Sequence, residues 1–126
     1  MKKFNCIVAG ICLSASLASA ETIEWSAGSL GGGWYTMSAG IAKIITSENP
    51  DIKIKVVPGG GTANPSKIQK NRSQIAMGLD TVSYLAVNAK GMYGKKHDKV
   101  SLIGQGLSDQ ILHVVRSKDA KYTNIA

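Results

Sequence analysis

A glycine-rich loop between a strand-like run and a helix-like run constrains the fold of this chain most strongly. The loop reads Ala-Gly-Ser-Leu-Gly-Gly-Gly-Trp-Tyr at residues 27–35, after a strand predicted at residues 22–26 and before a helix predicted at residues 37–46. Glycine lets the backbone approach another group closely, and the first N–H groups of a helix have no partner inside it. Such a loop suits a carboxylate or a phosphate. The alternative interpretation is a turn without a ligand.

The unit of strand, glycine loop and helix occurs more than once. After the first helix, the apolar patterning predicts, in order, a strand at 52–57, a second glycine loop at 58–65, a short helix at 65–71 with Asn64 as its N-cap, a strand at 74–79, a helix at 81–89, a basic loop at 90–99, and strands at 100–104 and 111–115. Alternating strands and helices predict an α/β fold with a mostly parallel sheet flanked by helices. Helices that begin at the same end of such a sheet point into one crevice. We therefore expect the two glycine loops to meet.

Two nucleotide-binding motifs fail at the first loop. The spacing of Gly28 and Gly33 matches the start of a P-loop, but Trp34 and Tyr35 stand where that motif needs Lys and Ser or Thr. The dinucleotide-binding pattern fails because Leu30 occupies its second glycine position. These departures argue against nucleotide hydrolysis and against a dinucleotide cofactor.

A third motif supplies the alternative function. Residues 27–31 resemble the nucleophile elbow of serine hydrolases, with Ser29 as the nucleophile, and Asp80 or Asp109 and then His113 follow in the expected chain order. Against it, the loop follows the first strand of the mature chain, so no earlier loop is available to donate an oxyanion-hole N–H. A small periplasmic serine hydrolase using Ser29 therefore remains the alternative to a binding protein without enzyme activity.

Residues 1–20 have the pattern of a cleavable signal peptide. Lys2 and Lys3 form a positive start, residues 6–17 an apolar middle, and residues 18–20 an Ala-Ser-Ala cleavage site. A membrane span needs about 20 apolar residues, and this run is shorter. We predict cleavage after Ala20 and a periplasmic location, which leaves a mature chain without cysteine.

The mature chain, residues 21–126, has the length of one modest domain. It keeps 13 of the 15 basic residues and all 8 acidic residues, for a formal charge of +5. The densest basic cluster, residues 95–99, has no interleaved aromatic residues, which favours a solvated loop over a nucleic-acid site. Two isolated histidines and no cysteine argue against a structural metal site, and nothing predicts a cofactor.

Three motifs, met in this order, resemble the TAXI family of solute-binding proteins, which serve tripartite ATP-independent periplasmic (TRAP) transporters. They are the glycine loop with its aromatic pair at residues 28–35, the Pro-Gly-Gly-Gly-Thr-x-Asn loop at 58–64, and the Ile-Ala-x-Gly-Leu-Asp turn at 75–80. The resemblance spans nearly all of the mature chain. It implies a two-lobed periplasmic binding protein, monomeric when complete, that delivers a small organic anion to membrane permease subunits. The implied ligand is a glutamate-like amino acid or a dicarboxylate.

The resemblance also implies which residues contact the ligand. These are Ser29, Gly32, Trp34, Tyr35, Gly60, Gly61, Thr62, Asn64, Asp80, Gln105 and Gln110. Several of them have a second possible role: the aromatic pair as core residues, Thr62 and Asn64 as helix caps, and Asp80 as an N-cap rather than a group that binds an ammonium.

The length of the chain departs from the family pattern. Family members run to roughly 300 residues in two lobes of ordinary domain size, whereas this sequence ends just past the strand expected to cross into the second lobe. Residues 21–126 are therefore expected to form the N-terminal lobe of such a protein. We expect this lobe alone to bind solute weakly and to be incompletely stable.

Overall fold

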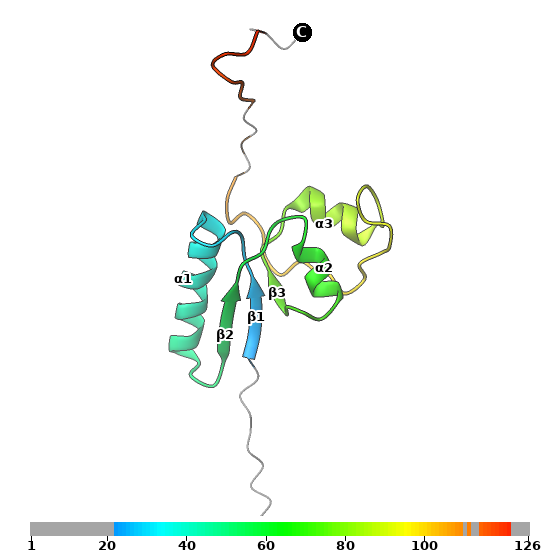
Figure 1. The fold of residues 1–126 in the computed structure, drawn as a ribbon. Helices are drawn as coiled ribbons and strands as arrows, with labels where there is room; N and C mark the ends of the chain where they lie inside the picture. Colours follow the sequence, from blue (N-terminus) through cyan, green and yellow to red (C-terminus); the bar gives the residue numbers. More distant parts are fainter. Residues whose placement is uncertain (1–21, 110, 112–113, 122–126) are drawn as a thin grey trace, which may run out of the picture.

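The computed structural model describes residues 22–109, 111 and 114–121, and its centre is a three-stranded parallel sheet (Figure 1). The strands are β1 (Thr22–Ser26), β2 (Lys53–Val57) and β3 (Ile75–Ala76), in the order β2-β1-β3. The helices of this part of the chain are α1 (Gly33–Glu48), α2 (Asn64–Gln69) and α3 (Asp80–Val87). Helix α1 packs against β2, whereas α2 contacts β3 and α3. The expected α/β class, with a parallel sheet flanked by helices, is confirmed.

The hydrophobic core lies around the carboxyl end of β1, the central strand. Trp25 is 6% exposed and packs with Ala27, with Ala42 of α1 and with Met77, which follows β3. Partly buried side chains of α1 and β2 surround this cluster, among them Ile41, Ile45, Ile54 and Val56. The register pairs Trp25 with Val56 on one side and with Ile75 on the other. Strand β1 is thus paired along both of its edges and is the central strand of the sheet.

A chain of polar side chains ties β1 to the start of the second glycine loop. The Ser26 and Ser73 hydroxyls are 2.8 Å apart, and Ser73 donates a hydrogen bond to Glu24 at 2.9 Å. From α2, the Lys67 ammonium donates to the Ser26 hydroxyl at 3.1 Å and to the Pro58 carbonyl at 2.7 Å. Buried hydroxyls need partners of this kind, so Ser26 and Ser73 fit this position although the surrounding core is apolar.

The bounds of one helix and one strand differ from the sequence expectation. Helix α1 begins at Gly33 rather than near residue 37, because Gly32 has an extended backbone and its carbonyl accepts the Thr36 N–H at 3.0 Å. The helix therefore starts at the last glycine of the loop. Strand β3 is limited to two residues rather than residues 74–79, since only Trp25 and Ser26 of β1 pair with it.

The strand predicted at residues 100–104 is wrong. These residues have no regular secondary structure, and Leu102 and Ile103 are 76% and 82% exposed. A strand requires a neighbour that takes up its backbone N–H and C=O groups, and no described strand lies beside this segment.

The structure describes only some of the residues at the two chain ends for which the sequence makes a prediction. Of the strand predicted at 111–115, Ile111, Val114 and Val115 are described as exposed residues outside any strand, while residues 112–113 lie outside the described residues. The predicted signal peptide also lies outside them. Within the described part of the chain, no helix is long and apolar enough to cross a membrane.

Candidate functional site

The two glycine loops meet at the carboxyl ends of β1 and β2. The Ala27 N–H donates to the Val57 carbonyl at 2.9 Å, and one step further the Gly59 N–H donates to the Gly28 carbonyl at 2.9 Å. A groove of about 350 Å³ lies over this junction. Its lining residues come from both loops, the start of α1 and the N-cap of α3: Gly28, Ser29, Gly32, Gly33, Trp34, Gly60, Gly61 and Leu79.

The glycines of the second loop hold the two loops together and keep the groove open. A Cβ at Gly59 would collide with the Asn64 side chain and lie 2.7 Å from the Ala27 carbonyl oxygen, so only glycine allows this approach. A Cβ at Gly61 would lie 2.9 Å from the Leu79 side chain. At Gly60, by contrast, a Cβ would meet nothing within 4 Å. Gly60 therefore faces open space in the groove.

Asn64 fixes the second loop from below. Its side-chain amide is 1% exposed and donates to the carbonyls of Ser26, Ala27 and Met77 at 3.2, 2.8 and 2.7 Å. Its side-chain oxygen accepts the Gly60 N–H at 3.1 Å. The expected N-cap role is wrong, because Ala63 is the N-cap of α2 and Asn64 is its first residue. One buried side chain thus joins the ends of β1 and the third strand to the groove.

The start of α1 supplies the positive potential of the groove. Gly33, Trp34 and Tyr35 are its first three residues, so their N–H groups have no acceptor within the helix. The N-cap Gly32 offers no side-chain oxygen, and the first turn contains no acidic residue. No charged side chain lines the groove either. The dipole of a 16-residue helix therefore acts there without a protein counter-charge.

The structure brings five of the expected ligand contacts together in the groove and places the others elsewhere. Ser29, Gly32, Trp34, Gly60 and Gly61 line it. Of the others, Tyr35 packs against the core and donates to the Val56 carbonyl at 3.4 Å, and Asn64 lies buried beneath the groove. Thr62, Asp80 at the start of α3, and Gln105 in an irregular segment are exposed. Gln110 lies outside the described residues.

Asp80 does not cap α3 from outside the helix. The N-cap is Leu79, and Asp80 is the first helical residue, with its carboxylate accepting the Thr81 N–H at 2.6 Å. A carboxylate in the first turn still stabilises α3, because it interacts favourably with the positive end of the helix dipole. Whether Asp80 also binds an ammonium group stays a prediction, and its exposed side chain leaves it accessible for that role.

Sequence reasoning missed three groove residues and one tether. Gly28, Gly33 and Leu79 line the groove, and the position of Leu79 at the end of the strand predicted at 74–79, at the same sheet edge as both loops, was a usable signal. The tether is residues 93–97, where the Tyr93 hydroxyl donates to the Thr62 carbonyl of the second loop. Burial raises the pKa of the Tyr93 phenol.

His97 corrects the expectation of a fully solvated loop at residues 95–99. It is 8% exposed, and its ring packs edge-on against Tyr93. Nδ1 lies 2.9 Å from the Lys95 carbonyl, which can only accept, so Nδ1 carries a proton, and Nε2 is hydrogen-bonded to the Ser66 hydroxyl at 3.0 Å. The ring links the loop to α2.

The hydrolase alternative gains no support from this geometry. Ser29 is exposed, and the one described histidine, His97, bonds to Ser66 instead; His113 lies outside the described residues. Among the described residues there is also no group of three His, Cys, Asp or Glu side chains that could hold a metal ion.

A larger hollow of about 520 Å³ lies between α1 and β2 and is less suited to a ligand. Ala39, Ala42, Ile54 and Val56 supply most of its apolar wall, with Lys43 at its edge. It contains no glycine loop and no helix start. We therefore assign the candidate site to the smaller groove, where backbone donors and both loops converge.

Comparison with known families identifies the chain. The model of the NMT1-like family matches residues 25–126, which include both glycine loops and every groove residue. A comparison with curated proteins and one with solved structures gave no match. The chain belongs to the NMT1-like family, a periplasmic binding protein-like family, and this membership is consistent with a solute-binding role.

Proposed function

We propose that this protein is the periplasmic solute-binding subunit of a TRAP-type transporter, and that it captures a small organic anion for delivery to membrane permease subunits. The observation that carries the proposal is the groove at the start of α1, where backbone N–H groups stand free and no charged side chain lines the walls. The family membership supports solute binding. The signal-peptide pattern of residues 1–20 and the three TAXI-like motifs support the location and the transporter class.

The chemistry of the groove favours a carboxylate next to a short apolar chain. The carboxylate would accept hydrogen bonds from the N–H groups at the start of α1. Trp34 and Leu79 would contact the carbon chain, since both line the groove. A glutamate-like amino acid or a dicarboxylate offers both a carboxylate and a short carbon chain. Asp80 would bind the ammonium group of an amino acid. A volume of about 350 Å³ lies at the lower end of the range for small-molecule sites.

The proposal is tested by tryptophan fluorescence during titration with L-glutamate and with succinate. Trp34 lines the groove, so binding should change its emission. Gly60→Val places a side chain in the open groove, whereas Gly104→Val makes the same change at an exposed glycine outside both loops and the tether, whose Cβ also meets nothing within 4 Å. Gly60→Val should lower the affinity at least tenfold, because its side chain should keep the carboxylate from at least one N–H group at the start of α1. Losing one hydrogen bond to a charged group costs about 1.5–3 kcal/mol.

Gly104→Val should bind as the unsubstituted protein does. An equal response of all three proteins would place binding outside the groove. Hydrolysis of an ester substrate by Ser29, abolished by Ser29→Ala, would favour the alternative function instead.

A further inference from the structure

The charge of the protein is concentrated in one half of the described chain. Residues 22–63 contain three basic and three acidic residues, so they are formally neutral. Residues 64–99 contain seven basic and two acidic residues, for a formal charge of +5. An asymmetry of this size creates a local potential that the net charge of the chain does not describe.

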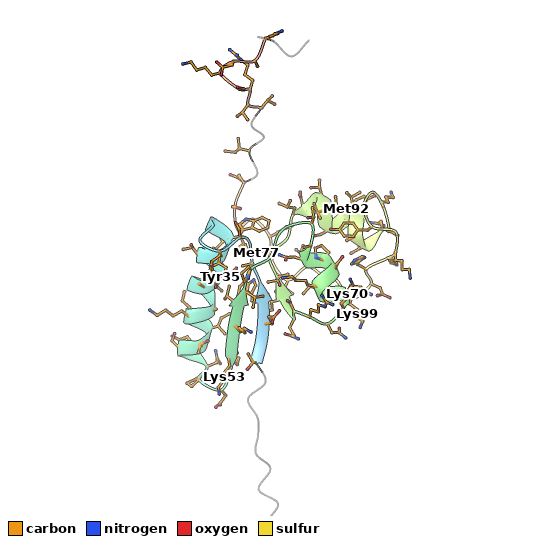
Figure 2. The ribbon with its side chains drawn as sticks, viewed as in Figure 1. Tyr35, Lys53, Lys70, Met77, Met92 and Lys99 are labelled. Carbon is orange, nitrogen blue, oxygen red and sulfur yellow. The ribbon has the colours of Figure 1, made fainter. Side chains whose placement is uncertain are left out.

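Hydrogen bonds between α2 and the loop after α3 bring these charges onto one surface. The Gln69 side chain donates to the Asp98 carboxylate at 2.9 Å and accepts the Lys99 N–H at 3.0 Å. The Lys99 ammonium donates to the Asn71 side chain at 3.2 Å. Lys70 follows Gln69 directly, and Figure 2 shows Lys70 and Lys99 side by side. The loop therefore lies against the end of α2.

We call the resulting patch the basic surface and define it by Lys70, Arg72, Lys95, Lys96 and Lys99. All five residues are exposed. Asp98 is the acidic residue of the loop, and its carboxylate accepts from Gln69. That hydrogen bond lowers the Asp98 pKa, as do a backbone hydrogen bond and the charges of Lys96 and Lys99. None of the five residues lines the groove, so the surface is separate from the proposed solute site.

We propose that the basic surface docks on an anionic phospholipid bilayer. Four of its five cations are lysines, which are strongly hydrated point charges suited to diffuse attraction, whereas bidentate recognition of a single group favours arginine. Protein interfaces are depleted in lysine and enriched in aromatic residues, and a nucleic-acid site would interleave aromatics with the charges. The surface has neither feature. A membrane of anionic headgroups requires only a cluster of exposed positive charge.

The test is co-sedimentation of the mature chain, residues 21–126, with lipid vesicles. Vesicles of phosphatidylcholine mixed with phosphatidylglycerol are compared with vesicles of phosphatidylcholine alone, at several salt concentrations. The triple variant Lys70→Glu, Lys95→Glu, Lys96→Glu reverses three of the five charges of the basic surface. The matched control Lys43→Glu, Lys53→Glu, Lys55→Glu changes three exposed lysines of α1 and β2 and has the same net charge.

We expect the unsubstituted protein to bind only the anionic vesicles, and less tightly as salt rises. The basic-surface variant should lose roughly a hundredfold in partition coefficient, because each lysine near an anionic bilayer contributes about a factor of five. The control should lose less than about tenfold, since charges beyond the Debye length of ~8 Å are screened. Lys→Gln versions of the same triple should show an intermediate loss with an unchanged circular dichroism spectrum.

Two results would overturn the proposal. One is that both triple variants lose binding equally, which would mean that net charge rather than this surface drives adsorption. The other is that the unsubstituted protein stays in solution with anionic vesicles, or binds neutral vesicles as well. Neither result bears on solute binding in the groove, which the fluorescence titration measures separately.

Discussion

Asn64 shows how a single buried residue can organise a groove whose lining does not include it. The residue before a proline at a helix start is a typical N-cap, and the sequence predicts that role. The fold instead presents three backbone carbonyls, those of Ser26, Ala27 and Met77, within reach of its amide. Buried carbonyls need donors, so tertiary contacts determine the role of Asn64, and local sequence rules cannot reveal them.

Asn64→Ala should therefore reduce the free energy of unfolding by about 3 kcal/mol, because the Gly60 N–H and the Ala27 and Met77 carbonyls lose the Asn64 side chain as a partner. Asn88→Ala is the matched control. Its amide donates only to the Tyr84 carbonyl at the exposed end of α3, and its loss should cost no more than about 1 kcal/mol. Urea denaturation measures both values. Equal losses in the two variants would mean that Asn64 has no special structural role.

Gly59 and Gly60 are neighbours with opposite tolerance. Gly59→Ala forces a Cβ against the Asn64 side chain and the Ala27 carbonyl, and it should cost about 3 kcal/mol of unfolding free energy. Gly60→Ala adds a methyl group to open space and should change that free energy by less than about 0.5 kcal/mol. Thermal unfolding of the two variants checks the contrast. If Gly60→Ala proved the more damaging substitution, the loop geometry described here would be wrong.

At the scale of elements, the sequence predicted the part of the fold that is locally determined. The alternation of residues 52–57 gave β2, and the apolar spacing at Ile41, Ile44 and Ile45 gave α1. The segment at 100–104 has a strand-like composition but no strand, because pairing depends on a neighbour. Composition does not specify that neighbour.

The tether at residues 93–97 holds the second glycine loop through the Tyr93 phenol. The contribution of this hydrogen bond to the free energy of unfolding should therefore depend on pH. Burial raises the Tyr93 pKa above its usual value of 10, which means that the folded state favours the protonated phenol. The contribution is therefore complete below pH 10 and is lost as the pH rises through the raised pKa. Tyr93→Phe should cost about 1 kcal/mol at neutral pH by removing the bond to the Thr62 carbonyl.

Denaturation at a series of pH values compares the two proteins. The difference between them should be constant at neutral pH and should shrink at high pH, where the Tyr93 phenolate can no longer donate. A difference that grew with pH would contradict the assigned direction.

At the scale of the whole molecule, the sheet order places the groove and the basic surface on different parts of the protein. Both glycine loops meet because β1 and β2 are parallel neighbours whose carboxyl ends share one edge. The sequence predicted this convergence, and with it the groove positions of Ser29, Gly32, Trp34, Gly60 and Gly61. It could not predict side-chain directions.

Tyr35 illustrates that limit. It is adjacent to Trp34 in α1, but successive helical residues point about 100° apart. Trp34 therefore reaches the groove while Tyr35 packs against the core beside Val56. Three of the five cations of the basic surface, Lys95, Lys96 and Lys99, were interpreted from the sequence as part of a solvated loop. Their grouping depends on the hydrogen bonds that join the loop to α2.

The central claim is that the groove binds a carboxylate through backbone N–H groups, and backbone amide NMR tests it most directly. An open groove buries less of a ligand than an enclosed pocket, and chemical-shift titration detects such weak binding. On addition of L-glutamate or succinate, the amide signals of Gly33, Trp34 and Tyr35 at the start of α1 should shift saturably with one common affinity. The signal of Gly40, further along α1, should not. Saturable shifts confined to other parts of the protein, or none at all at these amides, would contradict the account.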